Sequence, residues 1–278
     1  MTTVEFSGLI FLSSLAAGLL GALTGLGGGV VIVPVLTLLF HVDIRYAIGA
    51  SLVSVIATSS GAAAAYVREG YSNVRIGMFL EIATTLGAVL GAWLTTRVPT
   101  NAIGFIFALV LLYSAVASWR KKESHAGNTR PNKLAERLRL CGSFPVVGGK
   151  EEYVAQHVPA GFGLMFSAGT LSGLLGIGSG AVKVLAMDQA MGLPFKVSTT
   201  TSNFMIGVTA AASAGIYLSR GYIAPELAMP VMLGVLAGSL TGAKILVHAR
   251  VNTLRLLFAL VIVALGVEML LNSIAGRL

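Results

Sequence analysis

The chain has 278 residues, of which 55% are hydrophobic and only 11% are charged, and its formal net charge is +8. Soluble domains keep roughly a quarter of their residues charged, so this composition excludes a protein that covers its surface in water. The apolar residues come in blocks of about 20, the length of helix that crosses a hydrocarbon core of ~30 Å. We therefore predict an all-α polytopic integral membrane protein without a soluble catalytic domain.

Eight apolar segments follow one another along the chain, and two of them are longer than one membrane span. They run approximately from Phe6 to Phe40, Tyr46 to Val67, Ile76 to Thr96, Ala102 to Trp119, Val158 to Met191, Val197 to Leu218, Pro225 to Val247 and Leu254 to Asn272. As a single helix the first would measure ~50 Å, well beyond the bilayer. Glycine interrupts both long segments, at Gly25-Leu26-Gly27-Gly28-Gly29 and at Gly176-Ile177-Gly178-Ser179-Gly180. Each long segment is therefore predicted to be a helix, a glycine break and a short half-helix.

The two halves of the chain resemble each other. A shift of 151 residues, which takes Gly25 to Gly176, aligns them from Gly25 to Phe107 without a gap. It places one glycine break on the other, Ser51 on Ser202, and the loop pair Gly70-Tyr71 on a second Gly-Tyr pair. We predict two homologous repeats of four apolar segments, residues 6–119 and 158–272, each beginning with a glycine-broken helix. Residues 120–157 join them, and the loop charges leave open whether the repeats are parallel or inverted.

The joining loop holds much of the positive charge. Its basic residues are Arg120, Lys121, Lys122, Arg130, Lys133, Arg137, Arg139 and Lys150. Short basic loops stay in the cytoplasm, so we place this loop there and the protein in the bacterial inner membrane, with anionic lipid as a contact. A nucleic-acid patch is the alternative, but interleaved aromatic residues are lacking and membrane orientation already explains the charge.

The glycine breaks are the predicted binding site for an anion. An interrupted helix leaves backbone groups without partners, which is tolerated where they are buried in protein or face a watery cavity. The N–H groups that open the half-helices at Val30 and Ala181 carry the positive end of the helix dipole. The break residues assigned to the site are Gly27, Gly28, Gly29, Gly178, Ser179 and Gly180. Glycines can instead merely permit close helix packing, which is the interpretation given to Gly87, Gly91, Gly238 and Gly242.

Four polar residues near the breaks complete the predicted site. Lys183 lies in the second half-helix, where a charge costs ~2.5–3.5 kcal/mol at the membrane midplane unless it is paired or faces a cavity. We expect it to face the anion; a lysine that snorkels to the interface is the alternative. Ser51, Ser202 and Asn203 are the candidates for oxyanion contacts. Glu81, the only carboxylate well inside a span, is either a proton-coupling group or a helix–helix hydrogen bond, and the sequence leaves both open.

The motif Gly-Leu-Gly-Gly-Gly-Val-Val-Ile-Val-Pro, from Gly25 to Pro34, resembles the TauE/SafE family of sulfite and organosulfonate exporters and toluene-sulfonate uptake permeases. The duplication and the chain length strengthen the resemblance, which covers about residues 8 to 272. It implies carriage of a small sulfur-containing anion such as sulfite or a sulfonate. The second copy departs from the motif, because Leu185 stands where the first has Pro34 and Lys183 where the first has Ile32.

The predicted function is secondary transport, with export as the expected direction, of a small sulfur-containing anion bound near the midplane between two broken helices. An anion channel, or a carrier for another small anion such as a carboxylate, is the alternative. An enzyme is not expected, because the spans contain no paired carboxylates and no histidine. No cofactor and no metal site are predicted, since the histidines lack ligand spacing. The anion, the coupling ion and the oligomeric state, a homodimer included, stay open.

Overall fold

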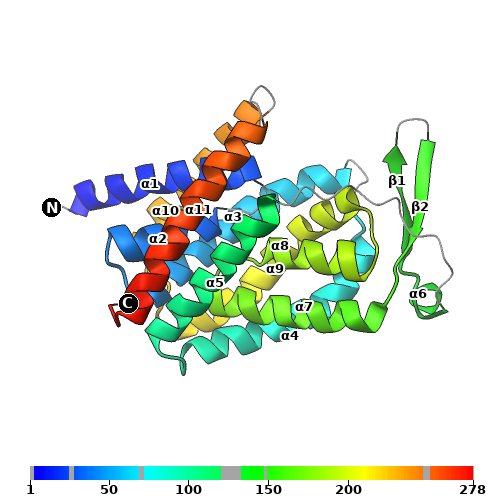
Figure 1. Cartoon of the computed structure of the whole chain (residues 1–278), viewed down its shortest axis with the longest axis horizontal. Helices are drawn as coiled ribbons and strands as arrows, with labels where there is room; N and C mark the ends of the chain where they lie inside the picture. Colours follow the sequence, from blue (N-terminus) through cyan, green and yellow to red (C-terminus); the bar gives the residue numbers. More distant parts are fainter. Residues whose placement is uncertain are drawn as a thin grey trace.

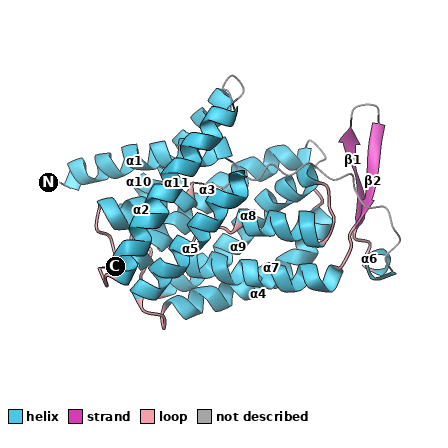
Figure 2. Cartoon of the chain, in the orientation of Figure 1, coloured by secondary structure: helices cyan, strands magenta, loops and turns pink. Residues whose placement is uncertain are grey.

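The computed structural model describes residues 3–24, 28–68, 72–119, 133–146, 149–246 and 251–277, which are predominantly helical (Figures 1 and 2). The helices of the first half are α1 (Thr3–Thr24), α2 (Gly29–Leu39), α3 (Ile44–Arg68), α4 (Val74–Thr95) and α5 (Thr100–Trp119). Those of the second half are α7 (Val158–Leu175), α8 (Gly180–Leu185), the π-helix η1 (Ala186–Ala190), α9 (Phe195–Ser219), α10 (Pro225–Leu246) and α11 (Val251–Ile274). Between them lie α6 (Lys133–Arg137) and the strands β1 (Cys141–Val146) and β2 (Gly149–Val154).

The helices present apolar surface on the outside as well as inside the bundle. Among the described residues, α4 and α7 are long and apolar enough to cross a membrane. Six further apolar helical stretches are shorter: Glu5–Leu20, Gly29–Leu39, Ile44–Ser60, Thr100–Val116, Pro225–Thr241 and Leu260–Ile274. Leucines on several helices lie exposed, among them Leu12, Leu109, Leu240 and Leu271. Exposed apolar side chains on this scale suit a helical bundle whose outer face meets lipid.

Local sequence signals fix where the helices α4 and α7 begin and end. Asn73 precedes α4, and its side-chain oxygen accepts a hydrogen bond from the Ile76 N–H at 3.0 Å, which satisfies one of the free donors of the first turn. α7 has Pro159 in its first turn, where a missing N–H costs nothing. It ends at Gly176, whose φ of 67° lies in the left-handed region that glycine adopts without strain.

Helices from the two halves pack against one another in pairs. α1 packs along α10, α4 along α7, α3 along α9, and α5 along α11. Glycine permits the closest of these approaches: a Cβ atom added at Gly87 or Gly91 would overlap backbone atoms of α7, and one added at Gly238 would overlap backbone atoms of α1. These three glycines therefore act as the packing residues that the sequence suggested.

A small β-hairpin stands at one end of the bundle (Figure 1). β1 and β2 pair antiparallel, with Cys141 opposite Val154 and Val146 opposite Gly149. The hairpin is held to the bundle by Asn73, whose side-chain amide donates to the Tyr153 hydroxyl at 2.9 Å. Burial raises the pKa of the Tyr153 phenol above its ordinary value, so this hydroxyl stays neutral. The sequence analysis predicts only a basic loop here, and the hairpin is an addition to that expectation.

Candidate functional site

The chain between α7 and α8 is buried and bent sharply. Gly176, Gly178 and the non-glycine Ser179 all have positive φ, at 67°, 69° and 45°. Ser179 is 3% exposed and directly precedes α8. A serine in the left-handed region is uncommon, so the fold imposes this backbone shape on the residue. Residues 176–179, between the end of α7 and the start of α8, belong to the stretch for which the sequence analysis predicts the second glycine break.

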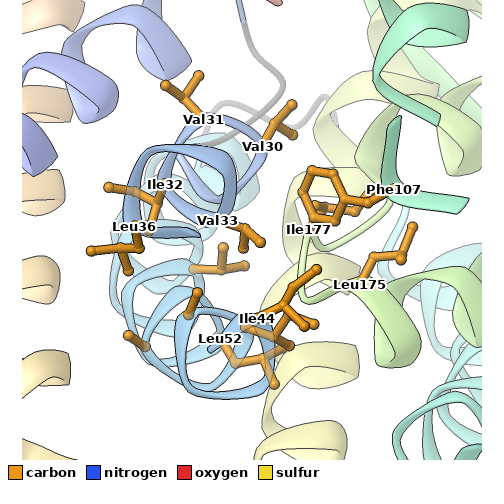
Figure 3. Close-up of a cluster of buried hydrophobic side chains, with 14 of the residues drawn as sticks. Val30, Val31, Ile32, Val33, Leu36, Ile44, Leu52, Phe107, Leu175 and Ile177 are labelled. Atoms are coloured by element: carbon orange, nitrogen blue, oxygen red, sulfur yellow. The ribbon is translucent and has the colours of Figure 1, made fainter. Parts of the chain in front are cut away.

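The other break leads into α2 and has a more ordinary backbone. Gly28 has a right-handed φ of −64°, and α2 then runs from Gly29 for 11 residues. A Cβ at Gly28 would come within 2.6 Å of the Val235 side chain, and one at Gly29 within 2.6 Å of the Ser51 hydroxyl. Figure 3 shows aliphatic side chains of α2, Ile32 among them, in a hydrophobic cluster with Ile44 and Leu52 of α3. Gly27, assigned to the site from the sequence, lies outside the described residues.

Ser51 and Ser202 both hydrogen-bond backbone at the second break. Ser51 on α3 donates to the Gly176 carbonyl at 2.9 Å, and Ser202 on α9 donates to the Gly180 carbonyl at 3.3 Å. The Gly176 carbonyl, at the C-terminal end of α7, is one that an interrupted helix leaves without a partner, and Ser51 supplies it. The Ser202 bond joins α9 to the first residue of α8. The two hydroxyl hydrogens are therefore engaged with backbone, and they reach an anion only after turning away from these carbonyls.

Lys183 lies on α8 and is completely buried. Its Nζ donates to the Thr209 hydroxyl of α9 at 2.6 Å. The Thr209 hydroxyl lies 2.7 Å from Oε1 of Glu81 on α4. One threonine thus links the two charged side chains that the structure places among its buried residues. Lys183 does not reach the surface of the bundle, which disfavours a snorkelling role.

Two polar atoms of this region have no hydrogen-bond partner among the described residues. One is Oε2 of Glu81, whose other oxygen also accepts from the Thr85 hydroxyl at 3.2 Å. The other is Oγ of Ser179. Buried polar groups without partners are uncommon and mark places where a ligand or a proton is accommodated. Across the described ranges, no three or more His, Cys, Asp or Glu side chains gather to hold a metal ion.

The structure brings together most of the predicted site residues. Gly180 lies beside Ser202, and a Cβ at Gly178 would meet Ile206 of the same helix α9. Asn203 is half-buried on α9, next to Ser202. The sequence analysis did not assign Thr209 to the site. The one signal available was that the shift of 151 residues places Thr58 on Thr209. Thr58 bonds only carbonyls of its own helix, at Ser54 and Val55, so the alignment alone gave no reason to place Thr209 in a site.

Comparison with known proteins gives a consistent result. The family model described as "Sulfite exporter TauE/SafE" matches residues 10–269. The chain is 26% identical to "Probable membrane transporter protein YunE" of Bacillus subtilis, over 96% of this chain and 98% of that protein. It is 27% identical to "Probable membrane transporter protein YdhB" of the same organism, over 85% and 89% of the two chains. A "Probable membrane transporter protein" of Methanocaldococcus jannaschii is 25% identical over 95% of each. No solved structure gives a significant match.

Proposed function

The chain belongs to the sulfite exporter TauE/SafE family of membrane transporters, and from this premise we propose that it carries a small sulfur-containing anion, such as sulfite or an organosulfonate. Export is the proposed direction. The proposed site lies between the two broken helices near the membrane midplane. It comprises the second break from Gly178 to Gly180, the first break at Gly28 and Gly29, and side chains of α3, α8 and α9.

The buried Lys183 is the observation that carries this proposal. A cation removed from water and from the membrane surfaces is costly unless a negative group accompanies it. The Lys183 ammonium has three N–H donors, of which one is directed at Thr209. The remaining donors suit the oxygens of a sulfite or sulfonate group, because hydrogen bonds between ionised groups are stronger than neutral ones. Ser179 directly precedes α8, and Ser202 and Asn203 lie on α9. These three side chains offer further polar contacts to the anion.

We also propose that the transport unit is a duplicated one, with repeats over residues 6–119 and 158–272. The helix boundaries support this: the shift of 151 residues takes α3 (Ile44–Arg68) onto α9 (Phe195–Ser219) and α4 onto α10. The helix pairs support it as well. α1 packs on α10 while α7 packs on α4, which is the exchange of partners that a two-fold relation between repeats produces.

The loop over residues 120–157 is proposed to lie in the cytoplasm of a cell whose inner membrane holds the protein. Cys141, the sole cysteine of the chain, is exposed on β1 and is a natural probe of this placement. A membrane-impermeant maleimide should label Cys141 only after intact cells are permeabilised. A Cys141→Ser variant gives the background. Labelling of intact cells would reverse the orientation.

Anion binding to purified protein tests the function directly. Sulfite, thiosulfate, sulfoacetate, phosphate and simple carboxylates are compared by the rise in Tm, since a ligand of the native state stabilises it in proportion to ln(1 + [L]/Kd). Sulfur-containing anions should give the largest rise. Lys183→Met should weaken their binding about 10- to 100-fold, because a hydrogen bond to a charged group contributes about 1.5–3 kcal/mol. Lys183→Arg keeps the charge with a different geometry, so its anion affinity should lie between those of the parent protein and Lys183→Met.

The matched control is Ile32→Met, because Ile32 aligns with Lys183 in the first half and is equally buried. This volume-conserving change should leave anion affinity close to that of the parent protein. If Lys183→Met is folded and binds the anions as tightly as Ile32→Met does, Lys183 has no place in the site. If carboxylates stabilise the parent protein more than the sulfur anions do, the proposed substrate class is wrong.

A further inference from the structure

Glu81 and Lys183 form an isolated pair inside the bundle. Glu81 is 5% exposed and Lys183 is 0% exposed, and the other buried polar side chains of the described residues are serines and threonines. The Thr209 hydroxyl joins the two side chains, 2.6 Å from Nζ of Lys183 and 2.7 Å from Oε1 of Glu81. Two opposite charges that face only each other are balanced while both are ionised and unbalanced once either changes.

The helices packed around this pair carry few other titratable groups. α7 has none, and α9 has Lys196 and Tyr217, near its two ends. Asp188 lies on η1, the segment that continues α8, and Arg75 lies in the first turn of α4. Tyr217 has its own partners, because its hydroxyl lies 2.9 Å from that of Thr95 and donates to the Gly173 carbonyl at 3.0 Å. A change in protonation at Glu81 is therefore answered first by Lys183.

Thr209 gives the pair two hydrogen-bonded arrangements. Its single hydroxyl hydrogen has two acceptors within reach, Oε1 of Glu81 at 2.7 Å and the Met205 carbonyl at 2.9 Å. When Glu81 is ionised, Thr209 accepts from Lys183 and donates to Glu81. When Glu81 is protonated, the hydroxyl can turn to the Met205 carbonyl and accept from the acid. Both states of Glu81 are thus satisfied without movement of a helix.

We propose that Glu81 is the proton-binding group of the carrier and that Glu81 and the substrate anion compete for Lys183, so that anion and proton cross together. The inference rests on the proposed function. Without anion, ionised Glu81 balances Lys183 through Thr209. A bound anion supplies that negative charge instead, and one proton then forms an O–H bond on Glu81 and restores neutrality. Departure of the anion on the far side returns Lys183 to Glu81, and the same O–H bond breaks and releases the proton.

The position of Oε2 agrees with this cycle. It is buried and has no hydrogen-bond partner among the described residues, whereas Oε1 contacts the hydroxyls of Thr209 and Thr85. A proton on Oε2 leaves both hydroxyl bonds to Oε1 in place, whereas a proton on Oε1 is accepted by Thr209 once its hydroxyl has turned to the Met205 carbonyl. With one proton, the dianions thiosulfate and sulfoacetate move one net negative charge, whereas the monoanion bisulfite moves none. Export from a cell then requires an outward anion gradient that exceeds the opposing proton gradient, and for bisulfite in vesicles the accumulation should follow the pH gradient alone. It should reach about tenfold per pH unit, the ratio that equals one unit of proton free energy.

The test uses the full chain in liposomes, with labelled sulfite, thiosulfate and sulfoacetate as probes and protein-free vesicles to subtract leakage. One assay measures exchange of labelled for unlabelled anion, which the proposed function requires. A second measures net accumulation driven by an acidic exterior. A third follows a pH-sensitive dye inside the vesicles when anion is added without a pH gradient. The parent protein should exchange at least one probe, accumulate it, and acidify the lumen as it enters.

Glu81→Gln should separate these readouts. Exchange should remain measurable, because a loaded carrier can reorient without releasing its proton, while accumulation driven by the pH gradient should fall to the level without a gradient. Thr209→Val keeps the side-chain shape and removes the link, and it should lower accumulation severalfold. Its matched control is Thr58→Val, whose hydroxyl bonds carbonyls of its own helix α3 and should leave accumulation unchanged.

The outcomes distinguish the two proposals. If the parent protein exchanges none of the three anions, the proposed function fails and the coupling with it. If it exchanges an anion without acidifying the lumen, the transporter stands and proton coupling is wrong. Coupling through Glu81 is also overturned if Glu81→Gln still accumulates anion on a pH gradient, or is folded and has lost exchange. Equal accumulation by Thr209→Val and Thr58→Val would remove Thr209 from the mechanism.

Discussion

The two glycine breaks occupy aligned positions in the chain and lead into segments of opposite character. The first segment, Gly28 with α2, is apolar apart from Thr37, and nine of its helical residues are buried. The second segment, Gly176 to Ser179 with α8 and η1, contains the buried Lys183 at the position of Ile32. The labelled side chains around α2 in Figure 3 are all hydrophobic, and none of these would balance a charge.

The backbones of the two segments differ as well. Gly28 is right-handed although it is glycine, whereas its counterpart Ser179 is left-handed although it is not. α2 continues for 11 residues through Pro34, while the aligned residues form six of α-helix and five of π-helix. Wider π-turns and strained residues occur most often at functional sites. The first segment is thus apolar and packed within the bundle, and the second carries the buried charge.

The largest effect should come from replacing each of the two buried charged side chains with its counterpart in the other half of the chain. Met232 and Ile32 occupy the positions that align with Glu81 and Lys183. Glu81→Met or Lys183→Ile alone leaves one buried charge without its partner, which costs about 3–5 kcal/mol. The double variant Glu81→Met with Lys183→Ile removes both charges, and its free energy of unfolding should fall much less than that of either single variant. Thermal unfolding of the purified proteins measures the three values.

A lysine placed at the aligned position of the first half serves as the control for these three variants. Ile32→Lys places a charge in the aliphatic cluster of α2 and should destabilise the protein as strongly as either single change. If the double variant is less stable than both singles, the two charges do not compensate each other. The asymmetry between the halves would then have another cause.

Much of the fold could be predicted because it follows from length and polarity. The predicted span Ile76 to Thr96 differs by two residues or fewer from α4, since polar residues and Pro99 bound an apolar run that lipid or helix packing requires. The second break is predicted because a segment from Val158 to Met191 exceeds the bilayer as one helix, and the structure has α7 and α8 as separate helices there. Gly87 and Gly91 were predictable as packing residues because only small side chains allow backbones to touch.

The contacts of the site could not be predicted in the same way. Thr209 joins Lys183 and Glu81 across separations of 26 and 128 residues, and no spacing along one helix reports such a meeting. The sequence placed Ser51 and Ser202 at the breaks but could not show that their hydroxyls donate to carbonyls there. The β-hairpin could not be predicted because its two strands have only six residues each, and β1, with Gly142 and Pro145, carries little alternation of polar and apolar residues.

A smaller effect is expected at Gly28, where the first segment depends on packing. Gly28→Ala is compatible with the backbone φ of −64°, but the new Cβ would lie 2.6 Å from the Val235 side chain. Overpacking of this kind costs about 1–3 kcal/mol. Adding Val235→Ala makes room and should restore part of the Tm, whereas Val235→Ala alone should lower it. Gly28 belongs to the anion site rather than to packing alone if the rescued double variant is stable yet binds anion more weakly than the parent.

The smallest effect is expected at Ser179, the counterpart of Gly28. A non-glycine residue in the left-handed region costs roughly 1–2 kcal/mol, and the Ser179 hydroxyl has no partner among the described residues to offset it. Ser179→Gly should relieve that strain, and after the larger chain entropy of glycine it should raise stability by about 0.5–1 kcal/mol. Ser179→Ala keeps the strain and removes only the hydroxyl. If the hydroxyl contacts the anion, both variants should show a smaller rise in Tm with sulfite or sulfoacetate, while only the glycine variant is more stable without anion. Undiminished Tm shifts in both would leave Ser179 as a purely structural residue, and the second break would then act on the anion through Lys183 alone.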